Sequence, residues 1–249
     1  MKGMIRYIPN CLTCLSLSFG FYAAIAGLSG HYFEAMTAIL IAAVFDFSDG
    51  LAARLLKAYS AMGKELDSLA DMVSFGVAPG MMLYSFMDTL LVRLSWNDSF
   101  GCKIFLLVAF IIPVFSGLRL AKFNIDERQK TSFLGLPVPA HAILWSSLIT
   151  VLASDVYTGV CLFPQLAERL STIPPAMMLI GLSVAVTVTS FLLVSEIPMF
   201  SLKITSLSWK ANRLPFLLAI SAILFVLFFG IAGMAAVILF YILLSLAHR

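Results

Sequence analysis

Long apolar segments follow one another along the chain, separated by short polar stretches. Most of them approach the roughly 20 apolar residues that an α-helix needs to cross a bilayer. The pattern predicts eight helices, at about residues 11–29, 33–52, 66–87, 103–121, 138–154, 174–194, 213–231 and 233–247. Only a turn from Gly230 to Gly233 separates the last two segments. A broken or re-entrant hairpin, with six or seven spans in total, is therefore the alternative.

The composition agrees with a membrane location. Hydrophobic residues make up 61% of the 249 residues and charged residues 12%, with a mean hydropathy of +1.01. Soluble domains carry about twice that share of charge. We therefore expect an all-α integral membrane protein, folded as a single membrane domain over residues 1–249, since no linker divides the chain.

The basic residues are unevenly divided between the two sides of the predicted helices. If the N-terminus is cytoplasmic, thirteen lie on the inner side: Lys2, Arg6, Arg54, Lys57, Lys64, Arg119, Lys122, Arg128, Lys130, Lys203, Lys210, Arg213 and Arg249. The outer side then carries three, Arg93, Lys103 and Arg169. Because cytoplasmic loops are enriched in Lys and Arg, this predicts a multi-pass protein of the cell inner (cytoplasmic) membrane. It also places the connection between the second and third helices at the cytoplasmic face.

Four aspartates lie in or beside these otherwise apolar segments: Asp46, Asp49, Asp67 and Asp71. Residues three or four apart share a helix face, so the first pair and the second pair each form a stripe on one of two consecutive helices. Each unpaired charge deep in a bilayer costs roughly 2.5 to 3.5 kcal/mol. Oxygen ligands without histidine or cysteine suit a hard cation, so we expect Mg²⁺ or Mn²⁺, and two such ions would balance four carboxylates. A proton or cation relay in a transporter also uses buried aspartates, and spacing alone leaves that alternative open.

The aspartates belong to a longer pattern, D-x-x-D-G-x-x-A-R-x8-G-x-x-x-D-x-x-x-D, which runs from Asp46 to Asp71. In every fixed position it resembles the signature of the CDP-alcohol phosphotransferase family, integral membrane enzymes of phospholipid synthesis. The resemblance implies a catalytic six-helix core over about residues 1–195. The transmembrane helix pair at 196–249 would be an addition to that core.

Three further stretches are similar to the bacterial phosphatidylserine synthase branch of this family. They read GKELDSLADMVSFGVAP (63–79), RLAKFNI (119–125) and FLGLPVPA (133–140). Lys122 is a departure, because arginine is expected more often there, and lysine lacks the planar fork of arginine. The resemblance implies a reaction of CDP-diacylglycerol with L-serine that gives phosphatidylserine and CMP. It also implies a homodimer.

Residue roles follow from the resemblance. The metal-binding positions are Asp46, Asp49, Asp67 and Asp71, and Asp71 is also the expected general base. The nucleotide and its phosphates are expected at Asp49, Gly50, Ala53, Arg54, Gly63 and Lys64. Candidates for contacts to serine are Arg119, Lys122, Asn124 and Ser74, the first two by their position at the cytoplasmic end of the fourth helix. For Gly50, Ala53 and Gly63, close helix packing is an alternative explanation.

Other functions find less support. Cys11 and Cys14 form a C-x-x-C without a second pair or histidine ligands, which favours apolar filler over a zinc or redox site. His31, His141 and His248 have no partner at catalytic spacing, and no feature suggests nucleic-acid binding. A transporter would spread its ionisable residues over several helices. Another acceptor, such as glycerol 3-phosphate, inositol phosphate or choline, remains open, although a phosphorylated acceptor would favour more arginines than Arg54 and Arg119.

Overall fold

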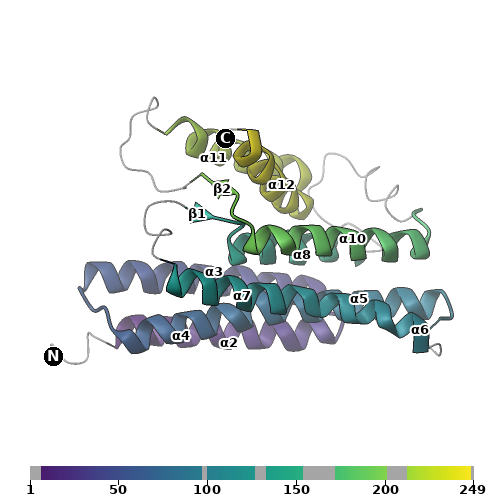
Figure 1. Ribbon diagram of the computed structural model, residues 1–249, viewed down its shortest axis with the longest axis horizontal. Coiled ribbons are helices and arrows are strands. Elements are labelled where there is room, and N and C mark those ends of the chain that lie inside the picture. The colour runs from purple at the N-terminus through teal and green to yellow at the C-terminus, as the bar shows by residue number, and fades with distance from the viewer. Residues whose placement is uncertain (1–6, 97–99, 127–132, 154–171, 201–211, 248–249) are drawn as a thin grey trace.

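A computed structural model describes residues 7–96, 100–126, 133–153, 172–200 and 212–247, and it is almost entirely helical (Figure 1). The α-helices are α2 (Ile8–Leu28), α3 (Tyr32–Leu55), α4 (Ala61–Asp71), α5 (Ala78–Arg93), α6 (Phe100–Lys103), α7 (Ile111–Ile125), α8 (Val138–Ala153), α10 (Pro175–Val194), α11 (Arg213–Phe229) and α12 (Ile231–Ala247). A π-helical segment, η1 (Met72–Val77), joins α4 to α5, and a 3₁₀ segment, η2 (Ile104–Phe110), precedes α7.

Each of the eight apolar segments predicted from the sequence corresponds to a helix. The third is longer than expected, because α4, η1 and α5 run without a break from Ala61 to Arg93. By length and apolar composition, five helical segments in the described part of the chain can cross a membrane, whereas α8, α11 and α12 are shorter apolar helices. The chain is therefore a multi-pass, all-α membrane protein. Several of the basic residues used to orient it lie outside the described residues: Lys2, Arg6, Arg128, Lys130, Arg169, Lys203, Lys210 and Arg249.

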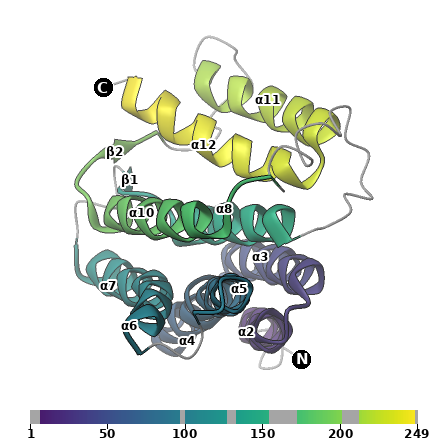
Figure 2. The same ribbon diagram turned by 90° about the vertical axis from the view of Figure 1, so that its right-hand side faces the viewer.

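The long helices lie side by side with roughly parallel axes and alternate in chain direction from α2 to α3, with α5 in the middle of the bundle (Figures 1 and 2). Helix α5 contacts α2, α8, α7 and α10. The hairpin of α11 and α12 forms an outer layer that joins the bundle through α12 and α8. The expected C-terminal helix pair is thus present, and its turn is Gly230, which has a positive φ of 57°.

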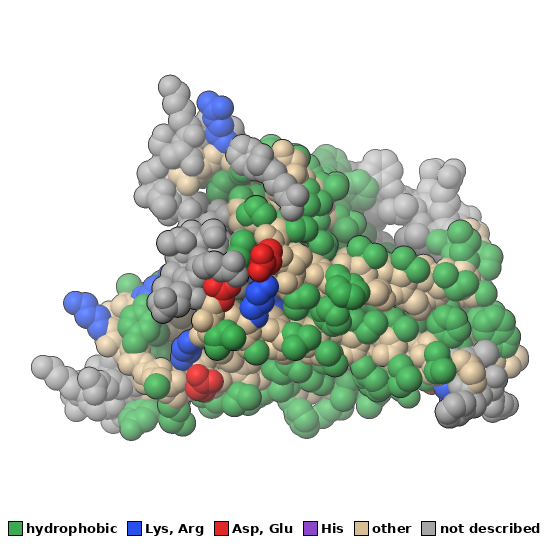
Figure 3. All heavy atoms as spheres, in the orientation of Figure 1, with side chains coloured by type: hydrophobic (Ala, Val, Ile, Leu, Met, Phe, Trp, Pro, Cys, Tyr) green, Lys and Arg blue, Asp and Glu red, His purple; other side chains and the backbone are tan. Residues whose placement is uncertain are grey.

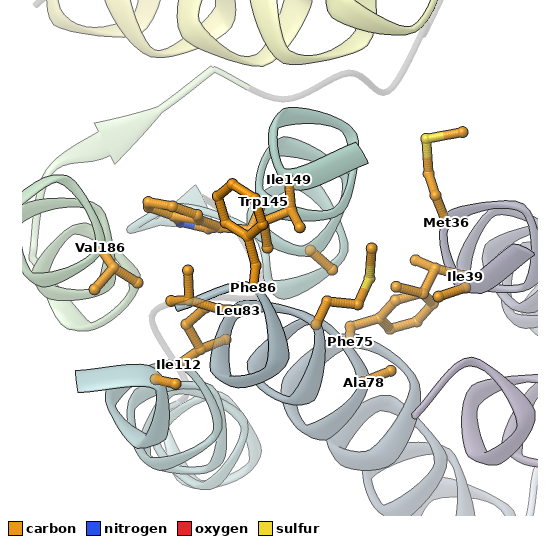
Figure 4. Packing of buried hydrophobic residues seen from close by; sticks show 14 of the residues in the cluster. Met36, Ile39, Phe75, Ala78, Leu83, Phe86, Ile112, Trp145, Ile149 and Val186 are labelled. Carbon is orange, nitrogen blue, oxygen red and sulfur yellow. The ribbon is translucent and has the colours of Figure 1, made fainter. Parts of the chain in front are cut away.

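Apolar side chains from most of these helices fill the core around α5. Figure 4 shows Phe75, Leu83 and Phe86 of the central helix among Ile39, Trp145 and other buried residues. Small residues let the helices approach closely, as is common in membrane bundles. A Cβ on Gly20 of α2 would lie 2.6 Å from the Cα of Ser74. The contact between α2 and η1 therefore depends on glycine at that position.

Two short strands connect the segment before α8 to the segment after α10. Strand β1 (Phe133–Leu134) pairs antiparallel with β2 (Pro198–Met199), a feature that the sequence did not predict. Gly135 follows with a φ of 76°, and its N–H donates to the carbonyl oxygen of Ile197 at 2.9 Å. The entry to α8 is thereby held against the end of α10.

Candidate functional site

A cavity of about 200 Å³ opens where the first turns of α2, the end of α3 and the start of α4 meet. Its lining is Pro9, Asn10, Thr13, Asp49, Gly50, Ala53, Ala58, Tyr59, Ser60, Gly63, Lys64 and Asp67. Charged side chains gather toward this end of the bundle, whereas hydrophobic side chains cover most of the rest of the face in view (Figure 3). The cavity therefore lies where the apolar surface gives way to a polar end.

The four aspartates converge beside this cavity. Asp46, Asp49 and Asp67 each place a carboxylate oxygen within 4.8 Å of the other two. Asp71 lies one turn beyond Asp67, and its carboxyl group interacts directly with that of Asp46. At these separations two unit charges repel by at least about 3 kcal/mol, even at an effective dielectric constant of 20. The arrangement is unfavourable unless protons or cations neutralise it.

The donor atoms fit a hard divalent cation. They are carboxylate oxygens, which Mg²⁺ and Mn²⁺ prefer over nitrogen and sulfur. In addition, the Oδ1 atom of Asp71 is buried and has no hydrogen-bond partner in the structure. A buried, unpartnered carboxylate oxygen is costly, so it indicates a missing ligand.

Asp49 is the most buried of the four, with 6% of its surface exposed. The hydroxyl group of Thr13 on α2 lies 2.5 Å from its Oδ2 atom and 3.0 Å from the carbonyl oxygen of Pro9. A hydrogen bond from Thr13 therefore fixes one oxygen of this carboxylate. Outer contacts of this kind orient metal-binding carboxylates in other proteins.

The local sequence explains how α4 enters the site. Ser60 is the N-cap, and its Oγ atom accepts a hydrogen bond from the backbone N–H of Gly63 at 2.9 Å. The cap starts the helix about two turns before Asp67. Directly after Asp71 the helix widens into η1, and π-helical turns inside α-helices occur frequently at functional sites.

Helix α4 packs mainly against α2, not against α3. A short connection between consecutive helices usually makes them direct antiparallel neighbours, which would place small residues between α3 and α4. They do bring their aspartates together, but α2 supplies the packing surface and the cavity occupies the space between. The small residues consequently differ in role, since Ala70 is buried whereas Gly50, Ala53 and Gly63 line the cavity.

Most of the residues expected around the nucleotide line the cavity: Asp49, Gly50, Ala53, Gly63 and Lys64. Arg54 does not. Its side chain is exposed, and its Nε atom donates to the carbonyl oxygen of Gly50, one turn back on α3, at 3.0 Å. A phosphate contact from Arg54 would require a different rotamer from the one observed.

The four residues expected to contact serine have separate environments. Arg119 is buried on α7, and its side chain forms no ion pair with the aspartates in the described part of the chain. Lys122 instead forms an ion pair with Glu196, with Nζ and Oε1 3.6 Å apart, and donates to the carbonyl oxygen of Val194. Both partners belong to the end of α10 and the segment that follows it.

The other two candidates connect helices. The Nδ2 atom of Asn124 donates to the hydroxyl group of Ser68 at 2.9 Å, which joins the end of α7 to α4. Ser74 is fully buried and donates to the carbonyl oxygen of Ser16 at 3.0 Å, in the close contact between η1 and α2. In the structure both side chains hold helices together.

Sequence reasoning missed the contribution of α2 and of the loop before α4. Asn10, Thr13, Tyr59 and Ser60 line the cavity, although none is a fixed position of the aspartate pattern. One signal was available for α2, since Pro9, Thr13, Ser16 and Gly20 recur at helical spacing and are all buried. A stripe of small and polar residues in an apolar helix indicates a packed, functional face.

None of the histidines and cysteines that the structure describes is among the residues that line the cavity. His141 is buried on α8, where its Nε2 atom lies 3.1 Å from both Nε1 of Trp145 and Oγ1 of Thr189. Cys11 and Cys14 are free thiols on exposed positions of α2. Cys161 and His248 lie outside the described residues.

Comparisons with known proteins agree with the motif. Residues 6–168 match the family described as CDP-alcohol phosphatidyltransferase. The CDP-diacylglycerol–serine O-phosphatidyltransferase of Bacillus subtilis is 35% identical over 158 residues, which cover 64% of this chain and 81% of the relative. The protein of the same name from Mycobacterium tuberculosis is 35% identical over 228 residues, 88% of this chain and 69% of the relative. The archaetidylserine synthase of Methanothermobacter thermautotrophicus is 32% identical over 142 residues, 56% of each chain.

Proposed function

Because the chain belongs to the CDP-alcohol phosphatidyltransferase family, we propose that it transfers the phosphatidyl group of CDP-diacylglycerol to L-serine and releases CMP. The observation that carries this proposal is the group of aspartates beside a cavity at the polar end of a membrane bundle. A substrate with two acyl chains and a charged nucleotide needs a site open to both lipid and water. The position of the cavity supports such a site.

The reaction is a substitution at phosphorus. The hydroxyl oxygen of serine forms a bond to the phosphorus of the phosphatidyl group, and the bond from that phosphorus to the oxygen shared with CMP breaks. CMP leaves with the electron pair of the broken bond, and the hydroxyl group gives up its proton. We assign that proton to Asp71, whose Oδ1 atom has no other hydrogen-bond partner.

The family and the donor set support a divalent metal site. Asp46, Asp49, Asp67 and Asp71 would hold the metal, and we propose two ions, Mg²⁺ or Mn²⁺. When bound, such ions neutralise a diphosphate and stabilise the leaving group. We propose that the hydrogen bond from Thr13 to Oδ2 of Asp49 orients this carboxylate for metal binding.

The chain itself contributes the walls of the nucleotide subsite. Gly50 lines the cavity, and a Cβ built there would come no closer than 4.0 Å to another atom of the protein. Protein packing therefore does not demand glycine at this position, and we propose that the space belongs to the nucleotide. Lys64 borders the same cavity, and its Nζ atom donates to the carbonyl oxygen of Asn124 at 3.4 Å. We propose that Lys64 meets a phosphate when the nucleotide binds, as Arg54 would after a rotamer change.

We further propose that the cavity faces the cytoplasm, in the cell inner membrane, and that residues 1–195 form the catalytic core. The matched residues, 6–168, fall inside that range. Homodimer formation stays a prediction from the family. The transporter alternative loses support, because a proton or cation relay does not require the fixed residues of the family pattern. Among acceptors, the names of the relatives favour serine over glycerol 3-phosphate, inositol phosphate or choline.

Release of CMP by purified protein tests the proposal. The assay contains CDP-diacylglycerol, Mn²⁺ or Mg²⁺, and one acceptor at a time: serine, glycerol 3-phosphate, inositol phosphate or choline. We expect release that requires both serine and metal, and a loss of roughly a hundredfold or more in Asp67→Asn, because metal ions contribute several kcal/mol to such reactions. Asp88→Asn makes the same chemical change at an exposed position about 30 Å further along the same helix, and should be active. Release with another acceptor alone would contradict the assignment of serine, and no metal-dependent release from folded protein would contradict the enzyme activity.

A further inference from the structure

Two hydrogen bonds join the last turn of α7 to the turn of α4 that carries Asp67. The Nδ2 atom of Asn124 donates to Oγ of Ser68 at 2.9 Å, and the Nζ atom of Lys64 donates to the backbone carbonyl oxygen of Asn124 at 3.4 Å. Oγ of Ser68 in turn donates to the carbonyl oxygen of Lys64 at 3.3 Å, which closes a small network. Asn124 therefore contacts α4 on both sides of Asp67, three residues before it and one residue after it.

Little else connects these two helices. In the described part of the chain, α4 packs mainly against α2 and η1, and its backbone makes few close contacts with α7. Met62 and Leu69 of α4 are largely exposed, so neighbouring helices cover only part of its surface. Packing alone therefore restricts the rotation of α4 about its own axis less than it would for a helix surrounded on all sides.

The end of α7 is a firm attachment point. The backbone N–H of Asp126 donates to the carbonyl oxygen of Lys122 at 3.0 Å, which continues the helical pattern to the end of α7. The Lys122 side chain donates to the carbonyl oxygen of Val194 at 3.3 Å and pairs with Glu196, which ties the same turn to the end of α10. Asn124 thus links α4 to a turn that the rest of the bundle already holds.

The rotation of α4 matters because Asp67 belongs to the group of carboxylates that we propose for the metal site. A carboxylate lies about 6 Å from the helix axis, so a rotation of about 20° would move it by about 2 Å. Mg²⁺ needs oxygen atoms at about 2.0–2.1 Å in a nearly octahedral arrangement. Ser68 projects about 100° around the helix from Asp67, so a bond to Ser68 can hold the turn without occupying the metal position.

The two bonds have different fates when a nucleotide binds. Lys64 is exposed and borders the cavity, so a phosphate can take its Nζ atom from the carbonyl oxygen of Asn124. The bond between Asn124 and Ser68 is partly buried, and neither residue belongs to the cavity lining. This second bond can therefore keep α4 in place while Lys64 turns toward the substrate.

Building on the proposed function, we infer that Asn124 is a positioning residue, which acts through Ser68 to hold the Asp67 carboxylate where the metal ion binds. Residues that orient metal ligands commonly have this effect, and their loss typically lowers metal affinity about 10- to 100-fold. Asn124 acts one step further from the ligand than such residues, so the lower end of that range applies. This role differs from a direct contact between Asn124 and serine, and experiment can separate the two.

Binding of Mn²⁺ tests the inference without turnover. Electron paramagnetic resonance measures free Mn²⁺ while full-length protein in detergent is titrated with the metal. We expect the Kd for Mn²⁺ to rise about tenfold in Asn124→Leu, which keeps the approximate size of the side chain and removes its donor, and in Ser68→Ala. Ser68→Thr keeps the hydroxyl group and should bind Mn²⁺ like the wild type. Asn124→Leu combined with Ser68→Ala should raise the Kd no further than either change alone, because both remove the same bond.

Kinetics separate this role from a contact with the acceptor. At saturating Mn²⁺ and CDP-diacylglycerol, the KM for serine should stay within about twofold of wild type in Asn124→Leu and in Ser68→Ala, because excess metal restores the occupied site. The control is Ser85→Ala, which removes a hydroxyl group that joins α5 to the carbonyl oxygen of Leu28 at 3.1 Å and lies outside the cavity lining. It should change neither the Kd for Mn²⁺ nor the KM for serine.

An unchanged Kd for Mn²⁺ in Asn124→Leu would overturn the inference, and a lower melting temperature beside it would show that the bond only stabilises the fold. The inference also fails if the KM for serine rises at saturating Mn²⁺ in Asn124→Leu but not in Ser68→Ala, because Asn124 would then contact the acceptor itself. Wild-type protein that binds Mn²⁺ but releases no CMP with serine contradicts the proposed function. In that case the effect of the variants on Mn²⁺ binding still decides the inference.

Discussion

Gly50 illustrates how a single residue can report on an absent substrate. Glycine costs about 1 kcal/mol relative to alanine inside a helix, and here the folded protein gains no close contact in return. Gly20 is different, because neighbouring backbone atoms exclude a side chain there. The same residue type therefore has a packing role at one position and a proposed binding role at the other.

Gly50→Ala should raise the KM for CDP-diacylglycerol by roughly tenfold or more, because the added methyl group enters the cavity, and should leave the melting temperature unchanged or slightly higher. Steady-state kinetics and thermal unfolding in detergent measure the two effects. Gly181→Ala is the matched control, since Gly181 is an exposed glycine of α10 with no atom within 4 Å of a built Cβ. An unchanged KM in Gly50→Ala would show that the nucleotide does not approach this helix.

The aspartates could be predicted from sequence because their spacing follows the helical repeat and the motif is local. Thr13 could not be predicted in the same way. It contacts Asp49 across 36 residues of sequence, and only the packing of α2 brings the two together. Arg54 belongs to the motif, but its contact could not be predicted either. A motif gives the position of a side chain on a helix and does not give its rotamer.

At the scale of elements, α2 organises the site more than the sequence suggested. It packs against α3, α4, α5 and η1, and its polar stripe supplies both the contact to Asp49 and the close approach to Ser74. Apolar length predicted the position of each helix, since crossing a bilayer requires long apolar segments, although the helix from Ala61 to Arg93 is longer than expected. The partner of α4 could not be predicted, because periodicity identifies a buried face without identifying what covers it. Strands β1 and β2 are too short to show any period.

Gly20→Ala should destabilise the contact between α2 and η1. The added Cβ would lie 2.6 Å from the Cα of Ser74, so one helix must move, and overpacking of this kind costs about 1–3 kcal/mol. A lower melting temperature in detergent is the expected result, with Gly181→Ala again as the control. A wild-type melting temperature would mean that α2 and η1 separate at no cost.

The whole molecule is polarised along its long axis. The cavity, the aspartates and the Lys64 side chain lie at one end, and the turn between α2 and α3 at His31 lies at the other (Figure 1). The charge asymmetry of the sequence predicts which end faces the cytoplasm. The structure describes only some of the basic residues behind that prediction, so orientation in the membrane needs its own measurement.

Cysteine labelling in intact cells provides that measurement. In a background without the four native cysteines, Tyr59→Cys beside the cavity should react with a membrane-impermeant maleimide only after the inner membrane is permeabilised. His31→Cys, in the exposed opposite turn, should react without that step. The reverse pattern would place the cavity on the outer side, where a cytoplasmic nucleotide could not reach it.

The π-helical turn at Met72–Val77 changes the direction in which the side chains after it point, relative to those before it. In an uninterrupted α-helix, Asp67 and Asp71 would share a stripe with Phe75, Ala78 and Met82, which are fully buried. An extra residue in one turn shifts the helical phase by up to about 100°. One continuous rod can thus present carboxylates in one direction and its apolar side in another. Removing a single residue from this turn would bring the two back into phase and rotate the acidic face toward the hydrocarbon-like interior, so residue count here is as constrained as residue identity.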